Sequence, residues 1–165
     1  QMSFKIHPLS SFPDATQICA AWSFGEWGQS NPGKNLSDAV ERYKKTALNM
    51  DDNLPASWLA ILDKTVIGMA SLKINDHPDL LNLSPWLASV YVHTDYRGTG
   101  VAKALCLHVK KEAQKRGFDK LYLFTHTAES MYSKLGWQKI RELKTHNPAQ
   151  QNPDILMVAD LIAPR

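Results

Sequence analysis

The sequence predicts an α/β domain with a mixed, mostly antiparallel central sheet of about seven strands and helices on both faces. Short apolar runs of strand length alternate with longer segments whose apolar residues recur at helical spacing. Past the middle of the chain, a glycine-rich turn at residues 95–100 joins an apolar strand to an amphipathic helix, and another strand follows. The chain has 165 residues, 44% of them hydrophobic, which suits a single domain at residues 2–165.

The first third of the chain is expected to form one strand and two helices. A short strand is predicted at residues 4–7 and a helix at 14–22, where apolar residues recur at helical spacing. Residues 24–33 contain three glycines and one proline, so a loop is expected there. Ser37 or Asp38 can cap the second helix, because short polar side chains accept hydrogen bonds from the first helical amides.

The middle of the chain predicts a strand pair followed by a long polar loop. Residues 58–62 and 66–74 form the pair, which turns at residues 63–64. Gly68 lies inside the second strand, which indicates a bulge or a close approach of another backbone. Residues 75–85 contain two prolines and are expected to form the loop.

The second half predicts two strand–helix pairs and two closing strands. Strand 86–92 leads through the glycine turn into an amphipathic helix that Gly117 ends. Strand 121–124 leads into a short helix that Thr127 can cap and Gly136 can end. The closing strands are expected at residues 137–143 and 155–161.

Composition and charge argue against several classes of protein. The net charge of +3 is too small to indicate nucleic-acid binding. No apolar run approaches the roughly 18 residues of a membrane span, and the N-terminus has no signal-peptide pattern, so no membrane association is expected. Cys19 and Cys106 lie in apolar helical segments and are expected to be buried free thiols in a cytoplasmic protein. The six histidines show no metal-ligand spacing, so no metal is expected.

The glycine-rich turn has the composition of a phosphate site. Backbone N–H groups at a helix start lack intrahelical partners, and together with the positive end of the helix dipole they bind phosphate well. The dinucleotide fingerprint needs a third small residue where Lys103 stands, and the Gly-Lys-Ser/Thr of a P-loop is absent. A phosphate-bearing ligand is therefore expected, held by neither of those two motifs.

Three motifs, in order along the chain, resemble the GNAT acetyltransferase superfamily. The first is the apolar strand 87–92, which leads directly into the turn. The second is Arg97-x-x-Gly100-x-Ala102, similar to the family's pyrophosphate motif Q/R-x-x-G-x-G/A. The third is similar to A-x-x-x-Y-x-K-x-G-F/W and occupies residues 128–137, one helix and one strand further on. The resemblance is closest over residues 55–140.

The resemblance implies how a coenzyme binds. In this family the fourth and fifth strands are parallel and splay apart, and the pantetheine arm of acetyl-coenzyme A lies between them against the free edge of the fourth strand. In this sequence that edge is expected to use the backbone of Val90, Tyr91 and Val92. The pyrophosphate is expected to bind the residues of the turn, namely Arg97, Gly98, Thr99, Gly100, Val101 and Ala102.

The resemblance also implies roles in catalysis. Tyr132 is the expected general acid for the departing thiolate, since a phenol with a pKa of about 10 is neutral at pH 7. Without the resemblance, the pattern of its helix favours a core tyrosine. Lys134 can reach the ribose phosphate of the coenzyme, although a solvated surface lysine explains it equally well.

No motif marks the general base that removes the proton of the attacking amine. Glu26 and Asp79 are the candidate catalytic carboxylates, because both lie in segments that wall the acceptor site in this family. Asp76, His77 and His93 are further candidates, and a chain of water molecules serves as well.

The predicted function is acetyl transfer from acetyl-coenzyme A, as co-substrate, directly to a primary amine of a small molecule or peptide. Trp27 and Trp86 are expected to flank the acceptor site. The protein is expected to be a monomer or a homodimer. The alternative is a non-catalytic acyl-coenzyme A-binding sensor on the same fold, and transfer of a longer acyl group or to a protein amine stays open.

Overall fold

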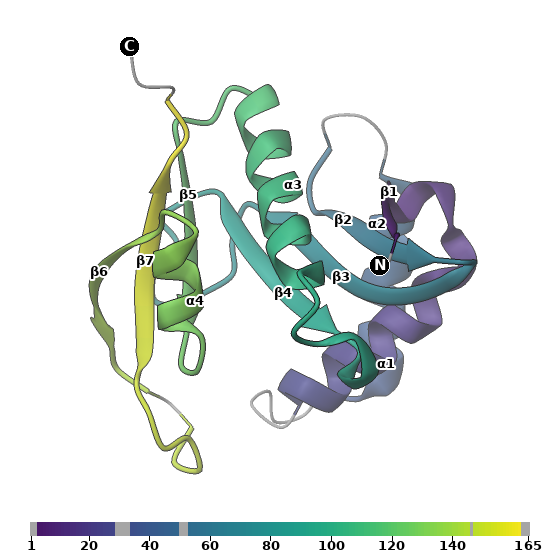
Figure 1. Ribbon diagram of the computed structural model, residues 1–165. Coiled ribbons are helices and arrows are strands. Elements are labelled where there is room, and N and C mark those ends of the chain that lie inside the picture. The colour runs from purple at the N-terminus through teal and green to yellow at the C-terminus, as the bar shows by residue number, and fades with distance from the viewer. Residues whose placement is uncertain (1–2, 29–33, 50–52, 146, 163–165) are drawn as a thin grey trace.

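A computed structural model describes residues 3–28, 34–49, 53–145 and 147–162, and in this part it contains the predicted seven-stranded sheet (Figure 1). The strand order is β1-β2-β3-β4-β5-β7-β6. Neighbouring strands are antiparallel, except that β4 and β5 run parallel, as expected. The strands are β1 Lys5–Pro8, β2 Ala56–Leu62, β3 Thr65–Lys73, β4 Trp86–Val92, β5 Lys120–Thr125, β6 Gln138–Leu143 and β7 Asp154–Asp160.

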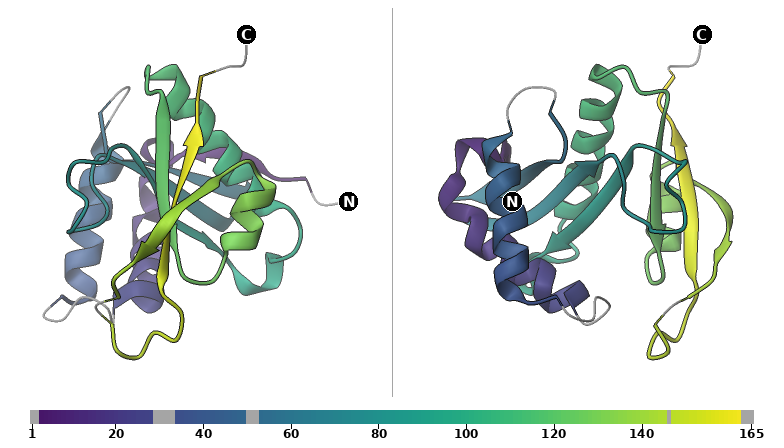
Figure 2. Two further views of the ribbon diagram at one scale, coloured as in Figure 1. Left: turned by 90° about the vertical axis from the view of Figure 1, so that its left-hand side faces the viewer. Right: turned by 180° about the vertical axis from the view of Figure 1, so that it is seen from behind.

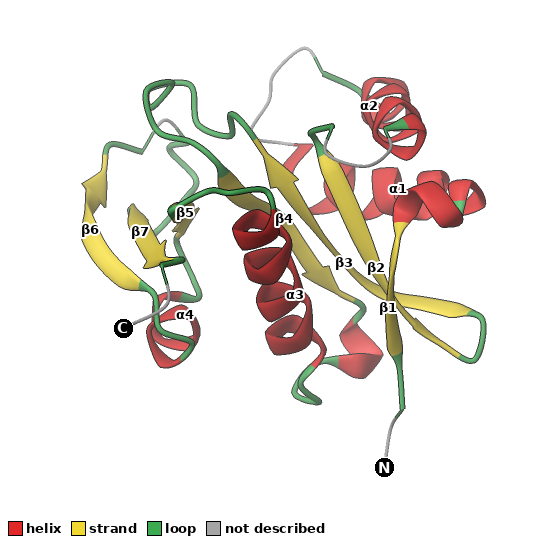
Figure 3. Ribbon diagram, turned by 90° about the horizontal axis from the view of Figure 1, so that it is seen from above, coloured by secondary structure: helices red, strands yellow, loops and turns green. Residues whose placement is uncertain are grey.

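Helices cover both faces of the sheet, as Figure 3 shows from above. One face carries α1 Thr16–Trp27 and α2 Leu36–Leu48, which stand side by side in front of the sheet when it is seen from behind (Figure 2). The other face carries α3 Val101–Lys115 and α4 Glu129–Lys134. Three short 3₁₀ turns complete the described elements: η1 Leu9–Ser11, η2 Pro13–Ala15 and η4 Thr94–Tyr96.

Buried side chains fill the space on both faces. The face under α3 and α4 contains the larger cluster, with Ile67, Leu105, Val109, Leu121 and Met157 at its centre. A second cluster lies under α1 and α2, and a third joins the β3–β4 loop to β5, β6 and β7; their buried members include Leu9, Cys19, Tyr43, Leu59 and Met69, and Leu80, Trp86, Leu143 and Leu156. Cys19 and Cys106 are buried free thiols, as expected.

The β2–β3 hairpin follows the prediction closely. Asp63 and Lys64 both have positive φ angles, 47° and 70°, as a tight two-residue hairpin turn requires. Both interpretations of Gly68 are correct. The register shifts beside it, between Ala60 and Ile61, and a Cβ on Gly68 would lie 3.1 Å from the backbone carbonyl oxygen of Tyr91 and 3.1 Å from the Leu105 side chain. The missing side chain therefore lets α3 pack directly on β3.

The first helix is longer than the sequence predicts. The predicted loop at residues 24–33 is wrong for residues 24–27, which form the last turn of α1, while residues 29–33 lie outside the described part. A glycine inside a helix costs only about 1 kcal/mol relative to alanine. Packing of α1 against α2 supplies the stabilisation that the local sequence lacks.

Helix caps also differ from the prediction by a few residues. Asn35, not Ser37 or Asp38, caps α2, because its Oδ1 accepts a 3.0 Å hydrogen bond from the Asp38 amide and Asp38 Oδ2 accepts one of 2.9 Å from the Asn35 amide. Before α4, the hydroxyl oxygen of Thr125 accepts a 3.4 Å hydrogen bond from the amide of Thr127. The Thr127 side chain makes no capping hydrogen bond. In both places the capping hydrogen bonds are made by a polar residue two positions before an expected cap: Asn35 before Ser37, and Thr125 before Thr127.

We predict opposite effects for alanine at two glycines. Gly68→Ala should destabilise the protein by about 1–3 kcal/mol, because the new methyl group meets the Tyr91 carbonyl oxygen, Leu105 and Val101 at 3.1 Å. Gly25→Ala is the matched control: it lies inside α1 with no atom within 4 Å of its Cβ, and should stabilise by roughly 0.5–1 kcal/mol. Urea unfolding measures both, and equal effects at the two sites would contradict the packing of α3 on Gly68.

Candidate active site

The two parallel strands separate soon after they start. Their register contains one pair, Trp86 with Tyr122, beside a 3.0 Å hydrogen bond from the Tyr122 amide to the Pro85 carbonyl. From there β5 follows β7 along its whole length while β4 stays with β3, and the two ribbons diverge towards their C-terminal ends (Figure 1). The edge of β4 beyond Trp86 is thus without a strand partner in the described part of the chain.

A bulge interrupts β4 in the stretch that is paired with β3 but not with β5. In the register with β3, Ser89 and Val90 together oppose a single residue, Ala70. Ser89 has a φ angle of 54°, which residues other than glycine seldom adopt. A bulge turns the backbone groups of a strand out of their regular directions. Backbone amides of β4 can therefore face the opening between the strands and not only β3.

The glycine-rich turn lies at the C-terminal end of β4. Gly98 and Gly100 have φ angles of 76° and 89°, so only glycine fits the turn without strain. Gly100 caps α3 and offers no side-chain acceptor, in contrast to Asn35 of α2. Across the described ranges, no protein acceptor bonds the amides from Gly98 to Lys103. Their N–H groups and the start of the α3 dipole are available to an anion.

Arg97 is held against β4. Its Nε donates a 2.9 Å hydrogen bond to the Val92 carbonyl, and its guanidinium carbon lies 5.3 Å from the centre of the Tyr91 ring. The Val92 carbonyl is one of the backbone groups expected to pair with a ligand, and a carbonyl oxygen can accept two hydrogen bonds. The guanidinium therefore lies where the unpaired strand edge meets the turn.

Tyr132 lies on α4 and is 7% exposed. Its ring packs edge-on against Trp137 with the centroids 6.0 Å apart, and the Cys106 thiol is a neighbour of its hydroxyl. Burial raises the pKa of the Tyr132 phenol well above its usual value, and the neighbouring Cys106 thiol raises it further. The phenol is neutral at physiological pH, in agreement with both the core and the general-acid interpretation. Lys134 is exposed at the end of the same helix.

The two candidate carboxylates occupy separate elements. Glu26 is exposed in the last turn of α1, and Asp79 is exposed in the loop between β3 and β4, where its amide donates to Nδ1 of His77 at 3.2 Å. Both carboxylates thus come from elements other than α4, which carries Tyr132. Both stay candidates by position in the fold.

Two residues of the β3–β4 loop have environments that the sequence does not reveal. Burial raises the pKa of the Asp76 carboxyl to about 6, although Lys73, 3.7 Å away, opposes the shift. His77 is 6% exposed, and its ring meets Phe124 edge-on at 5.0 Å. A carboxyl that titrates near neutrality suits a general base better than a fully solvated one. Sequence spacing carries no signal of such burial.

The tryptophans divide differently from the expectation. Trp86 is completely buried in the third cluster, so it does not line an acceptor site. Trp22 is half-buried on α1, and its ring lies 5.1 Å from that of Tyr91 on β4. Trp27 is half-buried at the C-terminal end of α1 and not in a loop, and its position beside an acceptor stays a prediction. A large apolar residue at the start of a strand, such as Trp86, is more often buried in the core than exposed in a cleft.

A cavity of about 360 Å³ lies away from the turn, towards the C-terminal half of α3. Its charged lining residues already interact: Arg116 Nη1 is 2.8 Å from Glu112 Oε1, and His108 Nε2 is 3.7 Å from Glu112 Oε2. Trp58 forms one wall, with the Arg116 guanidinium 5.6 Å from its ring centre. The charged residues that line this cavity are thus paired with one another.

A family model described as the acetyltransferase (GNAT) family matches residues 19–137, which include the unpaired β4 edge, the glycine turn and α4. The chain belongs to the GNAT acetyltransferase family. This GNAT chain shares the sheet order, the parallel β4–β5 pair and the open end of the sheet that the sequence resemblance implied.

Individual relatives agree with this assignment. Human N-acetyltransferase 8 is 30% identical over 138 residues, which cover 81% of this chain and 58% of the human protein. N-acetylaspartate synthetase of Xenopus tropicalis is 26% identical over 118 residues, or 68% of this chain and 39% of that protein. The chain thus spans about three fifths or less of the length of these two relatives.

Solved structures share the fold at low sequence identity. An aminoglycoside 6'-N-acetyltransferase complexed with coenzyme A superimposes with a TM-score of 0.75 at 15% identity, covering 98% of this chain and 99% of that one. In the described ranges, no helix is long and apolar enough to cross a membrane, and no group of three or more histidine, cysteine or acidic residues is arranged to hold a metal ion.

We predict that the turn binds coenzyme A through its backbone. Gly100→Ala should weaken coenzyme A binding about tenfold, a loss of about 1.4 kcal/mol, because the methyl group enters the open space beside the amides and strains the turn. Gly117→Ala is the matched control, since Gly117 has the same kind of φ angle, 87°, and equally open surroundings at the opposite end of α3. Calorimetric titration measures both, and equal affinities in the two variants would contradict the role of the turn.

Proposed function

We propose that this protein transfers the acetyl group of acetyl-coenzyme A directly to a primary amine of a small molecule or peptide. The observation that carries the proposal is the row of unpartnered amides from Gly98 to Lys103, which lies next to the unpaired edge of β4. A pyrophosphate would complement the amides, and an extended arm that contains amide groups would complement the strand edge. The coenzyme A complex of an acetyltransferase with the same fold supports this ligand.

The coenzyme would bind almost entirely through main-chain groups. The pyrophosphate would accept hydrogen bonds from the turn, where Gly98 and Gly100 allow it to approach the backbone. The pantetheine amides would pair with Val90, Tyr91 and Val92 as a short added strand. The Arg97 guanidinium, fixed beside Val92, would add a positive charge near the phosphates.

The chemical step would be a single acyl transfer. The lone pair of the amine nitrogen attacks the thioester carbonyl carbon, and the resulting oxyanion accepts a hydrogen bond from a β4 amide at the bulge. The carbon–sulfur bond then breaks and the electron pair stays on sulfur. Tyr132 gives its proton to that thiolate, and the proton lost by the amine passes to a base and to solvent, which restores the phenol.

The environment of Tyr132 suits this role. Burial keeps the phenol neutral, so its proton is present when the thiolate forms. The Cys106 thiol is a neighbour of its hydroxyl, so sulfur is already part of the surroundings of the phenol. Burial makes the Tyr132 phenol a weaker acid, and it also makes a coenzyme A thiolate released beside the phenol more basic, so the two shifts act in opposite directions on the proton transfer.

The acceptor is an amine, and its surroundings have both charged and aromatic character. Glu26, Asp79 and Asp76 are the carboxylates that could remove its proton, and Asp76 has the pKa closest to neutrality. Trp22 and Tyr91 provide an aromatic surface on the α1 side of β4. The relatives' names include an aspartate and an aminoglycoside acetyltransferase, so amine acceptors of very different size occur on this fold.

We predict binding and turnover in two linked assays. Coenzyme A at about 100 times its dissociation constant should stabilise the protein by ~2.7 kcal/mol, a rise in melting temperature of about 5–10 °C. Acetyl-coenzyme A with a panel of primary amines should release free thiol. Stabilisation without thiol release from any amine would indicate the non-catalytic acyl-coenzyme A-binding alternative, and no stabilisation would contradict the ligand.

Tyr132→Phe should lower turnover about 100-fold, because the thiolate loses its proton donor, while the affinity for coenzyme A should change less than about twofold. Tyr122→Phe removes the same hydroxyl from a half-buried tyrosine in the third cluster, on the opposite face, and should leave turnover unchanged. Stopped-flow thiol release and calorimetry measure the two quantities. Normal turnover in Tyr132→Phe would remove Tyr132 from the acid role.

A further inference from the structure

A histidine and a carboxylate meet at the C-terminal end of β5. His126 directly follows the strand, and its Nδ1 lies 3.6 Å from Oδ1 of Asp154, the first residue of β7. The β6–β7 loop holds the carboxylate in place, because Gln150 Nε2 donates a 3.0 Å hydrogen bond to the same Oδ1. The Asp154 side chain is 15% exposed and that of His126 is 43% exposed. The carboxylate is thus fixed, while the imidazole beside it is accessible to a ligand.

This pair lies on the face of the sheet opposite α3 and α4. Phe124 of β5 is paired with Leu156 of β7, and both side chains belong to the third cluster on that face. Side chains along a strand alternate between the two faces. His126 stands two residues after Phe124, and Asp154 stands two residues before Leu156, so both continue the same face. The distance between their side chains agrees with this placement.

The imidazole is level with the bulge of β4. The parallel strands share the pair Trp86 with Tyr122, and His126 stands four residues after Tyr122. On the other strand, Val90 stands four residues after Trp86 and belongs to the bulge. The two ribbons diverge over this interval (Figure 1). His126 and the bulge therefore stand on the two sides of the opening in which the thioester is proposed to lie.

The two ring nitrogens of His126 suit a proton acceptor. In a neutral imidazole one nitrogen carries the proton and the other accepts. A carboxylate beside Nδ1 favours the proton there, which leaves the lone pair of Nε2 to accept. Across the described residues, no hydrogen bond or ion pair occupies Nε2 of His126.

The histidines considered from the sequence are oriented the other way. Nδ1 of His77 accepts a 3.2 Å hydrogen bond from the Asp79 amide, and Nδ1 of His93 accepts one of 3.1 Å from the Asp95 amide. When these rings are neutral, Nε2 carries their proton and cannot accept another. His77 is also 6% exposed, so a bound amine has little access to it.

We propose that His126 is the general base that takes the proton of the acceptor amine, and that Asp154 is a positioning residue that orients its ring. The inference rests on the proposed acetyl transfer and names the base for it. The separation of 3.6 Å is longer than a hydrogen bond, and contacts of this kind often tighten when the substrate binds.

The proton balance of the step is complete. The lone pair of a bound neutral amine forms the bond to the thioester carbonyl carbon, and a proton of that nitrogen passes to Nε2 of His126. The carbon–sulfur bond breaks, its electron pair stays on sulfur, and Tyr132 protonates the thiolate. The imidazolium then gives its proton to solvent, and solvent returns one to the phenolate. The products are one amide and one thiol.

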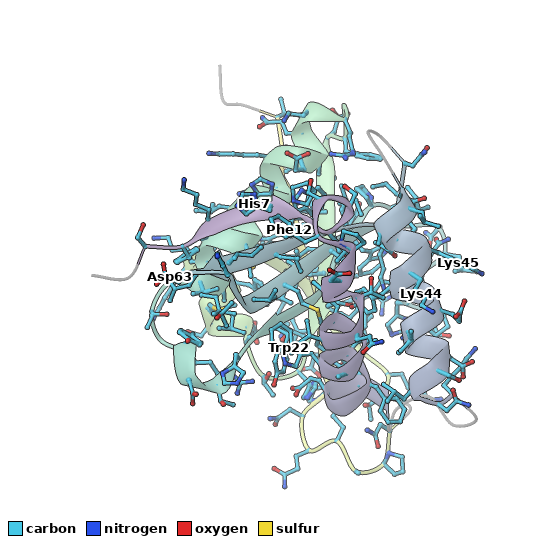
Figure 4. The ribbon with its side chains drawn as sticks, turned by 90° about the vertical axis from the view of Figure 1, so that its right-hand side faces the viewer. His7, Phe12, Trp22, Lys44, Lys45 and Asp63 are labelled. Atoms are coloured by element: carbon cyan, nitrogen blue, oxygen red, sulfur yellow. The ribbon has the colours of Figure 1, made fainter. Side chains whose placement is uncertain are left out.

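Acid and base come from opposite faces of the sheet. Tyr132 packs in the larger cluster under α3 and α4, whereas His126 continues the face that α1 and α2 cover. The attacking nitrogen and the departing sulfur are bonded to the same carbon, so two separate groups must serve them. Trp22 of α1 lies on the His126 face with its ring 5.1 Å from that of Tyr91 (Figure 4), which places an aromatic surface on the side of the base.

The first test measures thiol release from acetyl-coenzyme A with the fastest amine of the panel. His126→Gln should lower kcat about 100-fold and change KM for acetyl-coenzyme A less than about twofold, because only the proton acceptor is lost. His108→Gln is the matched control, since its Nε2 lies 3.7 Å from Glu112 Oε2 on α3 and its side chain is 31% exposed. It should keep kcat within about twofold. Added imidazole should restore part of the activity of His126→Ala.

The second test isolates Asp154. Asp154→Ala should lower kcat about tenfold and add little to the loss in His126→Gln, because it acts only through the ring. Nitrogen-15 NMR of the histidine rings reads the pair without turnover: the wild-type ring should carry its proton on Nδ1, and the Asp154→Ala ring on Nε2.

The outcomes separate the two proposals. A wild-type chain that acetylates no amine would overturn the proposed function and the base role with it. An active wild type with normal kcat in His126→Gln, or with an equal loss in His108→Gln, would overturn the base role alone. An unchanged ring proton in Asp154→Ala would overturn the positioning role of that carboxylate.

Discussion

Backbone groups left without partners determine what this fold can do. The amides and carbonyls of sheets and helices normally bond one another. In the described part of this chain, however, β4 is no longer paired with β5 after Trp86, and α3 starts at Gly100, which has no side chain to bond the first helical amides. The segment from His93 to Arg97 joins the two stretches along the chain, and several of its own amides are bonded within its turn. In the proposed function, the pantetheine arm binds the first stretch and the pyrophosphate binds the second.

The same opening depends on close packing elsewhere. Gly68 allows α3 to rest directly on β3, which fixes the helix start relative to the end of β4. Arg97 ties the turn back to the Val92 carbonyl at 2.9 Å. On the other side, β5 is paired with β7 over six residue pairs and cannot follow β4. The separation of β4 from β5 is thus a stable feature of the sheet, because β4 is already paired with β3 and β5 with β7.

Side chains add chemistry to a site that the backbone builds. Tyr132 on α4 is buried enough to stay neutral, as the proposed general acid requires, and β4 carries a bulge at Ser89 and Val90. In the proposed function, coenzyme binding and proton transfer are therefore carried by different elements. Sequence motifs mark the binding elements well, since a glycine turn tolerates few substitutions, but they mark the acceptor side poorly, since a loop carboxylate such as Asp79 has no fixed spacing.

The sequence by itself determined the order of the elements, the hairpin at residues 63–64 and the strand–turn–helix around Gly98 and Gly100, because these features arise from local periodicity and from backbone angles that only certain residues adopt. Tertiary structure alone decided the extension of α1 through Gly25, the burial of Trp86 and the raised pKa of Asp76. It also decided the positive φ angle of Ser89. These depend on which distant residues pack around a position, and spacing along the chain carries no record of that.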